Sequence, residues 1–419
     1  MTYGLIGERL GHSFSKWIHN RLFDYDYQLQ ELSNEQFHRF MTNREFTAIN
    51  VTIPYKEAVI PYLDEITDTA RAIGAVNTIV NRDGKLYGDN TDFFGMLALL
   101  NHVGIDLKNK HVLILGSGGT SKTALAVAKH SRCASVHRVS RTKQEDCLCY
   151  EEAATLANTQ VIINTTPCGM FPSIGESAID IAVFPHLSGV VDAIYNPLRS
   201  KLVCDALARG IPAVGGLYML VAQAAVAGER FIGQSVSQDS IDQLYHELLA
   251  TKQNLVLIGM PGCGKSTVGR LLAQKRGLTF IDTDREIEKQ EGCSIPELFS
   301  RVGEAGFREI EAAVVRRVSA CQGAVIATGG GAILRQENGS LLRENGRLYF
   351  LDRPLESLVT THDRPLSADR SALEQRYRER YDIYRTCCDV HIRSDGTPAQ
   401  TILQIEEDAD HETVGTQRA

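Results

Sequence analysis

A glycine-rich stretch in the second half of the chain combines the residue types that bind phosphate. Residues 259–266 read G-M-P-G-C-G-K-S, which fits the pattern G-x-x-x-x-G-K-[ST] and follows the apolar run 255–258. A strand, a glycine turn and a helix over 267–275 would let backbone N–H groups surround an anion at a helix N-terminus. Lys265 would reach the β- and γ-phosphates, and Ser266 would ligate Mg²⁺. A chance glycine turn before a helix is the alternative, and the two flanking elements make it the weaker one.

Two carboxylates follow this loop at a spacing of two residues. Asp282 and Asp284 lie in the expected strand 278–284. Because side chains two apart on a strand leave the same face, both would face the phosphate site. Mg²⁺ and an acceptor hydroxyl each need such an oxygen, although acids at a strand end are more often helix caps or solvated groups.

Further charged and glycine residues follow along the second half of the chain. Arg308 and Glu311 lie three apart on an expected helix, where the ordinary role is a surface ion pair. The triplet 329–331 ends an apolar strand and would let the backbone pack directly against a ligand. Residues 362–366, H-D-R-P-L, have the polar, irregular composition of a mobile lid, and Arg380 lies on a later helix.

The first hundred residues carry a second set of polar side chains next to expected strands and helices. Ser13 and Ser15 precede a helix and could hold a small carboxylate, although either could be only a helix N-cap. Asn50 and Thr52 leave the same face of the expected strand 47–54.

A lysine and an aspartate in the same region could act together. Lys56 comes near a helix start, where the helix dipole opposes a cation, although most such lysines are simply solvated. Asp92 opens another helix and could merely cap it. If folding brings the two together, they could transfer a proton to or from a carbonyl or alcohol oxygen.

Residues 103–205 have the pattern of a dinucleotide-binding fold. The strand 111–115 runs into G-S-G-G-T-S and a helix, with serine where a third glycine or alanine is usual. Gly116 and Gly118 would supply the tight turn and the close approach to a pyrophosphate. After the next strand, Arg141 stands where NAD enzymes carry an acid, which favours the 2′-phosphate of NADP. An exposed arginine at a strand end is the ordinary alternative.

Alternating strands and helices in this region predict a parallel, doubly wound sheet. Ligands of such sheets bind beyond the carboxyl ends of the strands. Gly215 and Gly216 then lead into the apolar helix 217–227, in which Gln223 needs a hydrogen-bond partner. The partner could be a substrate or a backbone carbonyl.

The whole region from 1 to about 248 resembles shikimate dehydrogenase. The resemblance rests on H-S-x-S at 12–15, N-V-T-I-P-Y-K at 50–56, G-A-V-N-T at 74–78, D-N-T-D at 89–92, the glycine turn 116–119, N-T-T-P at 164–167, Y-N-P at 195–197 and G-G-L-x-M-L-V-x-Q-A at 215–224. It implies that Lys56 and Asp92 form the catalytic pair for reduction of 3-dehydroshikimate by NADPH. The substrate residues that it implies are Ser13, Ser15, Asn50, Thr52, Asn77, Tyr195 and Gln223. The implied NADP residues are Gly116, Gly118, Gly119, Ser140, Arg141, Thr142 and Gly215.

This region departs from the family pattern at two places. Lys16 stands where proline is common, and the run 120–123 reads T-S-K-T where the family favours alanines and an arginine. Neither departure touches the catalytic pair, but the second leaves cofactor affinity open.

Residues from about 254 to 407 resemble shikimate kinase. The matching motifs are D-x-D at 282–284, F-R-x-x-E at 307–311, the glycine triplet, R-P-L at 364–366 and R-x-x-x-Y at 380–384. The resemblance implies that Asp284 polarises the shikimate 3-hydroxyl, that Arg308 and Arg380 clamp the carboxylate, and that Arg364 closes over the transferring phosphoryl group. Ser266 and Asp282 would organise Mg²⁺. The remaining implied ligand contacts are Gly330 for shikimate and Gly262, Gly264, Lys265 and Thr267 for ATP.

Composition limits the class of protein. The 419 residues are 43% hydrophobic and 23% charged, with a net charge of −7 and no basic block, so nucleic acid is not an expected partner. No apolar run approaches the ~18 residues of a membrane span, and the start lacks a signal-peptide pattern. Ten cysteines without a C-x-x-C pair suit reduced thiols in a cytoplasm.

Together these features predict an α/β protein with two active sites. We expect a substrate domain over 1–102 with returning helices at 216–250, a Rossmann NADP domain over 103–215, a P-loop kinase domain over 254–407 and a disordered tail over 408–419. The expected function is a bifunctional shikimate-pathway enzyme that uses NADPH, ATP and Mg²⁺ in aromatic amino-acid biosynthesis. A regulatory protein that senses shikimate or quinate is disfavoured by the retained catalytic residues. A kinase for another polyol is disfavoured by the paired arginines.

Overall fold

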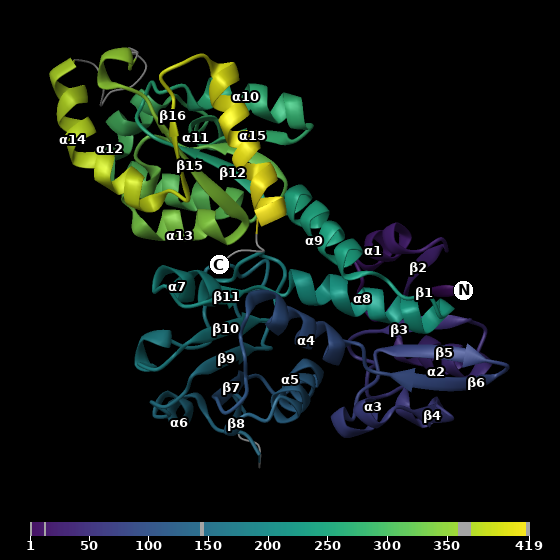
Figure 1. Ribbon diagram of the computed structural model, residues 1–419. Coiled ribbons are helices and arrows are strands. Elements are labelled where there is room, and N and C mark those ends of the chain that lie inside the picture. The colour runs from purple at the N-terminus through teal and green to yellow at the C-terminus, as the bar shows by residue number, and fades with distance from the viewer. Residues whose placement is uncertain (1, 12–13, 143–145, 359–369, 416–419) are drawn as a thin grey trace. The chain divides into compact units, whose positions relative to one another are not determined.

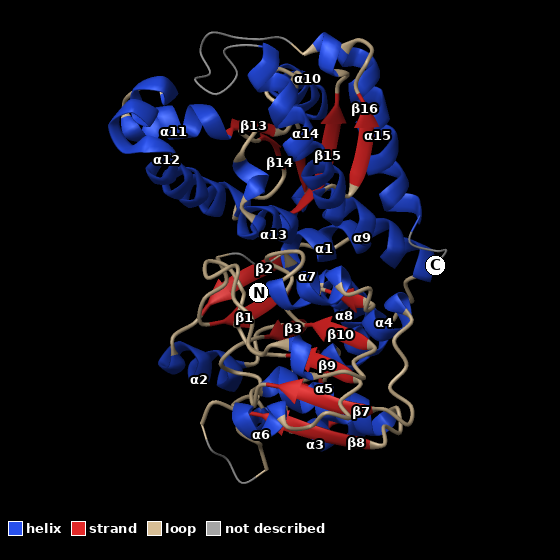
Figure 2. Ribbon diagram, turned by 90° about the vertical axis from the view of Figure 1, so that its left-hand side faces the viewer, coloured by secondary structure: helices blue, strands red, loops and turns tan. Residues whose placement is uncertain are grey.

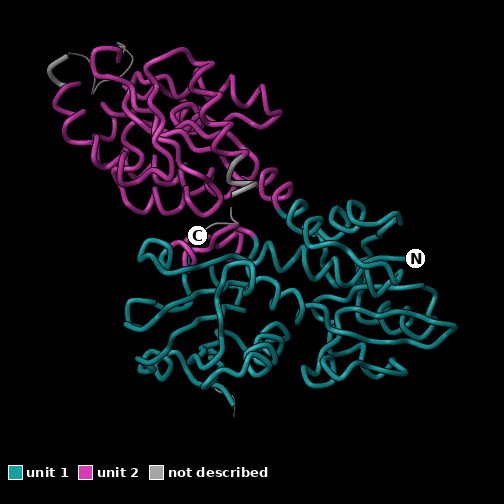
Figure 3. The backbone as a smooth tube through the Cα atoms, viewed as in Figure 1, with its two compact units in different colours: residues 1–169, 176–195, 205–245 teal, residues 170–175, 196–204, 246–419 magenta. Residues whose placement is uncertain are grey.

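The computed structural model describes residues 2–11, 14–142, 146–358 and 370–415. These residues form two compact units, drawn in different colours in Figure 3. Unit 1 comprises 1–169, 176–195 and 205–245, and unit 2 comprises 170–175, 196–204 and 246–419. The boundary after residue 245 falls within helix α9 (Gln238–Lys252). Each unit is described separately below, with the element labels of Figure 1.

Unit 1 begins with a six-stranded mixed sheet in the order β2-β1-β3-β5-β6-β4. Parallel pairs join β1 to β2 and β3, whereas β5 is antiparallel to both β3 and β6. The strands are β1 (Tyr3–Gly7), β2 (Tyr27–Glu31), β3 (Ala48–Val51), β4 (Glu65–Ile66), β5 (Thr78–Arg82) and β6 (Lys85–Asp89). The helices in this stretch are α1 (Ser15–Leu22), α2 (Asn34–Asn43), α3 (Asp68–Ile73) and α4 (Asp92–Val103).

The second sheet of unit 1 is fully parallel, in the order β11-β10-β9-β7-β8. Its strands are β7 (His111–Leu115), β8 (Ser135–Val139), β9 (Val161–Asn164), β10 (Gly189–Asp192) and β11 (Ala213–Val214). The accompanying helices are α5 (Gly119–His130), α6 (Tyr150–Ala154) and α7 (Lys201–Ala208). The apolar runs of the three central strands β7, β9 and β10 are buried, as expected for a parallel sheet with both faces covered.

A long helix, α8 (Leu217–Ile232), returns the chain to the first sheet of unit 1. It packs against α4, α1, β3 and β5 (Figure 1). The approach to α4 is close because Gly95 has no side chain: a Cβ atom there would lie 2.8 Å from the carbonyl oxygen of Met219. This packing places the polar side chains of α8 beside the ends of β3 and α4.

Unit 2 contains a third sheet, fully parallel, in the order β13-β14-β12-β15-β16, with helices on both faces (Figure 2). Its strands are β12 (Asn254–Ile258), β13 (Thr279–Asp282), β14 (Ala324–Ala327), β15 (Gly346–Asp352) and β16 (Val390–Arg393). Its helices are α10 (Lys265–Arg276), α11 (Thr283–Glu291), α12 (Ile295–Ser319), α13 (Gln336–Asn345), α14 (Arg370–Cys387) and α15 (Pro398–Gly415). The α/β architecture predicted from the sequence is confirmed.

Two local predictions are wrong. Asp284 does not lie on a strand: β13 ends at Asp282, whose carboxylate caps α11 by accepting from the backbone N–H of Asp284 and Arg285. The tail is not disordered from residue 408, because α15 continues to Gly415 and Asp408 accepts hydrogen bonds from Arg347 and Tyr349.

Candidate active sites

Lys56 and Asp92 meet in unit 1. Lys56 lies in the turn that follows β3, and Asp92 is the first residue of α4. The Lys56 Nζ lies 2.5 Å from the Asp92 Oδ2, and the two side chains are only 18% and 12% exposed. The sequence alone also allowed a solvated lysine at 56 and a simple helix cap at 92. The two instead contact each other as an ammonium and a carboxylate, a pair of groups that can transfer a proton to or from a bound molecule.

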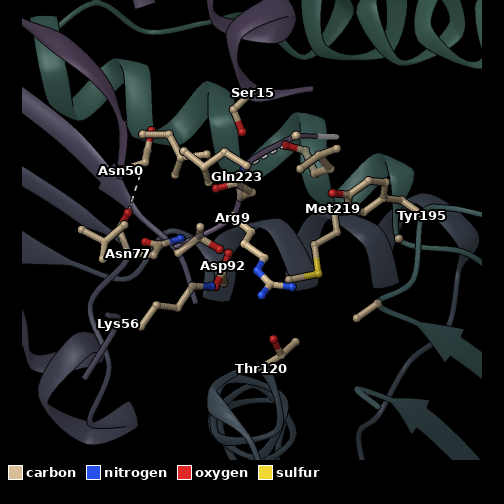
Figure 4. Close-up of a pocket in the computed structure, with 18 residues that line it drawn as sticks. Arg9, Ser15, Asn50, Lys56, Asn77, Asp92, Thr120, Tyr195, Met219 and Gln223 are labelled. Carbon is tan, nitrogen blue, oxygen red and sulfur yellow. Dashed lines mark hydrogen bonds and ion pairs between the residues drawn. The ribbon is translucent and has the colours of Figure 1, made fainter. Parts of the chain in front are cut away.

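This pair lines a cavity of about 380 Å³ (Figure 4). Of the predicted substrate residues, Ser15, Asn50, Thr52, Asn77, Tyr195 and Gln223 also line it. Thr52 lies one residue beyond the end of β3, which is shorter than expected, but it still reaches the cavity. Ser13 lies outside the described residues.

Hydrogen bonds fix the amide groups at the wall of this cavity. The Asn50 amide nitrogen donates to the carbonyl oxygen of Asn77 and to the hydroxyl of Thr78. The Asn77 side-chain oxygen accepts from the backbone N–H of Thr91, the residue before Asp92. Because these partners are buried, the amide side chains of the cavity wall are held in one orientation, unlike solvent-exposed side chains that change rotamer.

Gln223 and Tyr195 close the other side of the cavity. The Gln223 amide donates to the carbonyl oxygen of Leu220 at 3.1 Å, so it has the backbone partner that the sequence analysis considered beside a substrate. The side chain nevertheless lines the cavity. Burial raises the pKa of the Tyr195 hydroxyl, so this group stays protonated and able to donate.

Two residues at this cavity escaped the sequence prediction. Arg9, just after β1, brings a second cation to the wall, and Figure 4 shows its guanidinium near Met219 and Thr120. Gly216, rather than Gly215, lines the cavity, and a Cβ there would lie 2.3 Å from the carbonyl oxygen of Ala193. The sequence prediction had assigned only Gly215, as an NADP residue, and gave Gly216 no role. A lone arginine after a strand gave no signal.

The glycine turn after β7 fits a cofactor pyrophosphate. Gly116 has a φ of 115°, and a Cβ there would lie 2.5 Å from the Thr165 hydroxyl. Gly118 caps α5 and Gly119 opens it, and no atom would obstruct a Cβ at either position, so the space above the helix start is open. A helix N-terminus with open glycines suits a phosphate group.

The residues after β8 form the other part of the predicted cofactor site. The Ser140 hydroxyl accepts from the backbone N–H of Thr142 at 3.3 Å, which shapes the turn, and Arg141 between them is exposed. An exposed guanidinium at the carboxyl end of a Rossmann strand fits a ribose 2′-phosphate.

The phosphate loop of unit 2 has the backbone that its glycines predict. Gly259, Gly262 and Gly264 have φ values of 143°, 81° and 98°, which side chains rarely adopt. Lys265 opens α10 with 5% of its surface exposed, and its Nζ donates to the carbonyl oxygens of Gly259 and Met260. Thr267 lies exposed on the first turn of the same helix.

Ser266 and Asp282 come together beside this loop. The Ser266 Oγ donates to the Asp282 Oδ2 at 2.6 Å. A hydroxyl and a carboxylate are the oxygen donors that Mg²⁺ takes from a protein when phosphates supply others. The pair therefore fits the predicted metal position.

The glycine triplet 329–331 lets three charged side chains pack closely around it, and we call this group the acceptor side of the site. A Cβ at Gly329 would lie 2.6 Å from Asp284 and 2.9 Å from Glu311, and a Cβ at Gly331 would lie 2.3 Å from Arg308. The side chains therefore use the space that the missing Cβ atoms leave. Gly330 packs against Pro261 of the phosphate loop, which joins the acceptor side to the nucleotide side.

The two arginines of this cluster have different partners. Arg308 donates to Glu311 at 2.9 Å and to Glu304 at 3.0 Å, so the ion pair weighed from the sequence is real. Glu311 is 2% exposed, and burial raises the pKa of its carboxyl despite the neighbouring Arg308. Arg380, 8% exposed, donates to the carbonyl oxygen of Gly330. Arg364 lies outside the described residues.

Comparisons with known proteins find a matching family model in each of the two units. A family model described as shikimate dehydrogenase substrate binding domain matches residues 5–79, and one described as shikimate kinase matches residues 261–410. A shikimate dehydrogenase (NADP(+)) of Clostridium perfringens is 36% identical over 264 residues, covering 59% of this chain and 97% of the relative. One of Clostridium beijerinckii is 36% identical over 244 residues, covering 54% of this chain and 90% of the relative.

Solved structures resemble the same part of the chain. A chorismate mutase/shikimate 5-dehydrogenase fusion protein from Clostridium acetobutylicum matches with a TM-score of 0.56 at 36% identity, over 59% of this chain and 96% of that one. A shikimate 5-dehydrogenase from Thermus thermophilus, in complex with NADP(H) and shikimate, matches with a TM-score of 0.54 at 27% identity, over 59% and 99%. The chain therefore belongs to the shikimate dehydrogenase family and also carries a shikimate kinase domain, which makes it a shikimate-pathway enzyme with an NADP-dependent oxidoreductase part and a phosphotransferase part.

Proposed function

We propose that the chain catalyses two consecutive reactions. The first reduces 3-dehydroshikimate to shikimate with NADPH, and the second transfers a phosphoryl group from ATP to the 3-hydroxyl of shikimate. The observation that carries the first reaction is the Lys56–Asp92 contact at the cavity wall. The second rests on the acceptor-side cluster of Asp284, Arg308 and Arg380 around the glycine triplet.

In the reduction, the chain orients the substrate and supplies a proton, while NADPH would supply the hydride. Lys56 would donate a proton to the carbonyl oxygen as it becomes an alcohol, and Asp92 would hold the ammonium in place. The amides of Asn50, Asn77 and Gln223 would bind ring hydroxyls. Ser15, Ser13 and the Tyr195 hydroxyl would bind the carboxylate. The cofactor would be held by Gly116, Gly118, Gly119, Ser140, Arg141, Thr142 and Gly215.

In the phosphoryl transfer, positioning and charge stabilisation supply most of the catalysis. Asp284 would accept a hydrogen bond from the attacking 3-hydroxyl and polarise it. Arg308 and Arg380 would bind the substrate carboxylate, which guanidinium geometry suits. Ser266 and Asp282 would hold Mg²⁺, and Lys265 with Arg364 would offset charge on the transferring group.

We propose that each part of the chain with its own sheet has a separate role. Residues 1–102 and the helices at 216–250 would bind the substrate of reduction, residues 103–215 would bind NADP, and residues from 254 onward would form the kinase. We also propose a cytoplasmic location, which is supported by the cysteines: none of the ten, all within the described residues, forms a disulfide. None of the helices in the described part of the chain is both long and apolar enough to cross a membrane.

Two single substitutions test the assignment of each site. Lys56→Ala should lower kcat for NADPH-dependent reduction by roughly 10²- to 10⁴-fold, the usual contribution of a positioned proton donor, and leave phosphorylation of added shikimate unchanged. Asp284→Asn should instead lower kcat for phosphorylation of added shikimate and leave NADPH-dependent reduction unchanged. Loss of both activities in either variant, with circular dichroism unchanged, would contradict the proposal of two independent sites.

A further inference from the structure

An arginine that no motif includes lies beside the phosphate loop of unit 2. Arg353 directly follows β15, which pairs with β12, the strand that leads into the loop. A Cβ atom added at Gly264 would lie 3.8 Å from the Arg353 Nη1. The guanidinium therefore approaches the backbone just before Lys265 and the first turn of α10.

This guanidinium has no hydrogen-bond or ion-pair partner in the part of the chain that the structure describes. Within the described residues, no hydrogen bond or ion pair joins Arg353 to another side chain or to the backbone, and its Nε is buried without an acceptor. The neighbouring carboxylate, Asp352, is already engaged by the Tyr381 hydroxyl at 3.0 Å and by His391 at 2.8 Å. Leaving a buried donor unsatisfied is unfavourable, so the position calls for a ligand that accepts hydrogen bonds.

The surrounding charges specify the sign of that ligand. The Lys265 ammonium and the N-terminus of α10 already make the loop positive, and Gly264 is the N-cap of that helix. A second cation, Arg353, beside these two groups raises the electrostatic energy of the protein unless an anion lies between them. An anion with several acceptor oxygens would pair with all three groups.

We propose that Arg353 is a phosphate-binding residue of the kinase site, which contacts the triphosphate of ATP alongside the glycine loop. This inference rests on the proposed kinase function for the identity of the nucleotide. The planar guanidinium would donate to phosphate oxygens from the β15 side, whereas the loop N–H groups and Lys265 donate from the β12 side.

Direct binding measurements on the full chain test this proposal. The probes are ATP and inorganic tripolyphosphate, which lacks the adenosine, and the readouts are calorimetric Kd and the KM for ATP. Arg353→Gln should weaken both probes by roughly tenfold to a hundredfold, the range for charge-assisted hydrogen bonds, with the KM for shikimate unchanged. Arg353→Lys keeps the positive charge but loses the planar guanidinium with its paired N–H donors. Its affinities for the two probes should lie between those of the unsubstituted chain and those of Arg353→Gln. Arg317→Gln is the matched control, because Arg317 is exposed on α12 and paired with Glu286.

The thermal stability of the ligand-free variant separates a binding role from a structural one. Arg353→Gln should be at least as stable as the unsubstituted chain without ligand, because it removes an uncompensated cation. A less stable variant with unchanged affinity for both probes would overturn the proposal, and so would weaker ATP binding with unchanged tripolyphosphate binding. If the chain binds both probes but does not phosphorylate shikimate, the proposed function fails while the role of Arg353 is still decided by these affinities.

Discussion

Asn50 owes its orientation to side chains behind the cavity wall. The Tyr27 hydroxyl donates to the Asn50 Oδ1 at 2.7 Å, and the Tyr27 ring stacks on His19 with centroids 4.0 Å apart. Both aromatic residues are fully buried. The hydrogen bond leaves the Asn50 amide nitrogen to donate towards Asn77 and Thr78, so the direction of the amide is set before any substrate binds.

Removing the Tyr27 hydroxyl should therefore loosen Asn50, which we propose binds the substrate. Tyr27→Phe should raise the KM for 3-dehydroshikimate roughly 2- to 10-fold, which corresponds to one neutral hydrogen bond, with a smaller change in kcat. Steady-state kinetics at saturating NADPH measure it, and the KM for ATP serves as the internal control. An unchanged KM for 3-dehydroshikimate would show that Asn50 does not depend on Tyr27.

His19 should make folding of this region sensitive to acid. Burial lowers its pKa from 6.5 to about 3, although a hydrogen bond with Asn50 acts in the opposite direction. The unfolded chain therefore binds the extra proton at a pH where the folded chain does not. The resulting stability is fully present above about pH 6.5 and is lost as the pH falls towards the folded pKa.

The variant His19→Gln should lack this pH dependence. Between about pH 7.5 and pH 4.5 the unsubstituted chain should lose about 2–3 kcal/mol more unfolding free energy than the variant does. Trp17 is the single tryptophan and lies two residues away on α1, so its fluorescence during urea unfolding reports on this region. Parallel losses in the two proteins would mean that His19 is protonated in the folded chain.

At the scale of elements, the contact between α4 and α8 sets the width of the cavity that Lys56 and Asp92 line. Asp92 begins α4, while Met219 and Gln223 lie on α8. Gly95 permits the approach, since a Cβ there would lie 2.7 Å from the Gln223 Cβ. Adding a single methyl group at this helix crossing should therefore change the width of the cavity.

Gly95→Ala should push α8 away and lower kcat/KM for reduction. The overpacking should cost about 1–3 kcal/mol, partly offset by the better helix propensity of alanine. Phosphorylation of added shikimate should be unaffected, and Asn101→Ala, at an exposed position of the same helix, should leave both activities unchanged. Full reductase activity in the Gly95 variant would show that the crossing tolerates a methyl group.

The elements also show which features sequence patterns can predict. The buried strands before both glycine turns were predictable, because apolar runs between glycine signals have few alternatives. The position of Asp284 was not, because Asp282 caps α11 and ends the strand two residues early. The length of α15 was underestimated because the contacts of Asp408 with Arg347 and Tyr349 are tertiary and leave no apolar pattern in the sequence.

Individual site residues were predictable only where a motif contains them. The contact of Lys56 with Asp92 joins residues 36 apart in sequence. Their residue types indicated that the two could act together if folding brought them into contact, and the family resemblance implied that they form a pair. Arg9 and Arg353 belong to no motif, and their placement depends on how β1 and β15 end beside a cavity and a phosphate loop. Such positions follow from the tertiary fold and not from local pattern.

At the scale of the whole molecule, each unit contains its own set of site residues. The Lys56–Asp92 cavity is built entirely from unit 1, and the described residues of the phosphate loop and acceptor cluster all belong to unit 2. The product proposed for the first site is the substrate proposed for the second. The two chemistries should therefore run in one purified chain without an added enzyme.

A single assay tests this claim most directly. The purified chain is supplied with 3-dehydroshikimate, NADPH, ATP and Mg²⁺, while NADPH absorbance and shikimate 3-phosphate are followed together. We predict loss of NADPH and formation of shikimate 3-phosphate in equal final amounts, with shikimate accumulating when ATP is left out. Loss of NADPH without shikimate 3-phosphate would contradict the kinase assignment, and no loss of NADPH would contradict the reductase assignment.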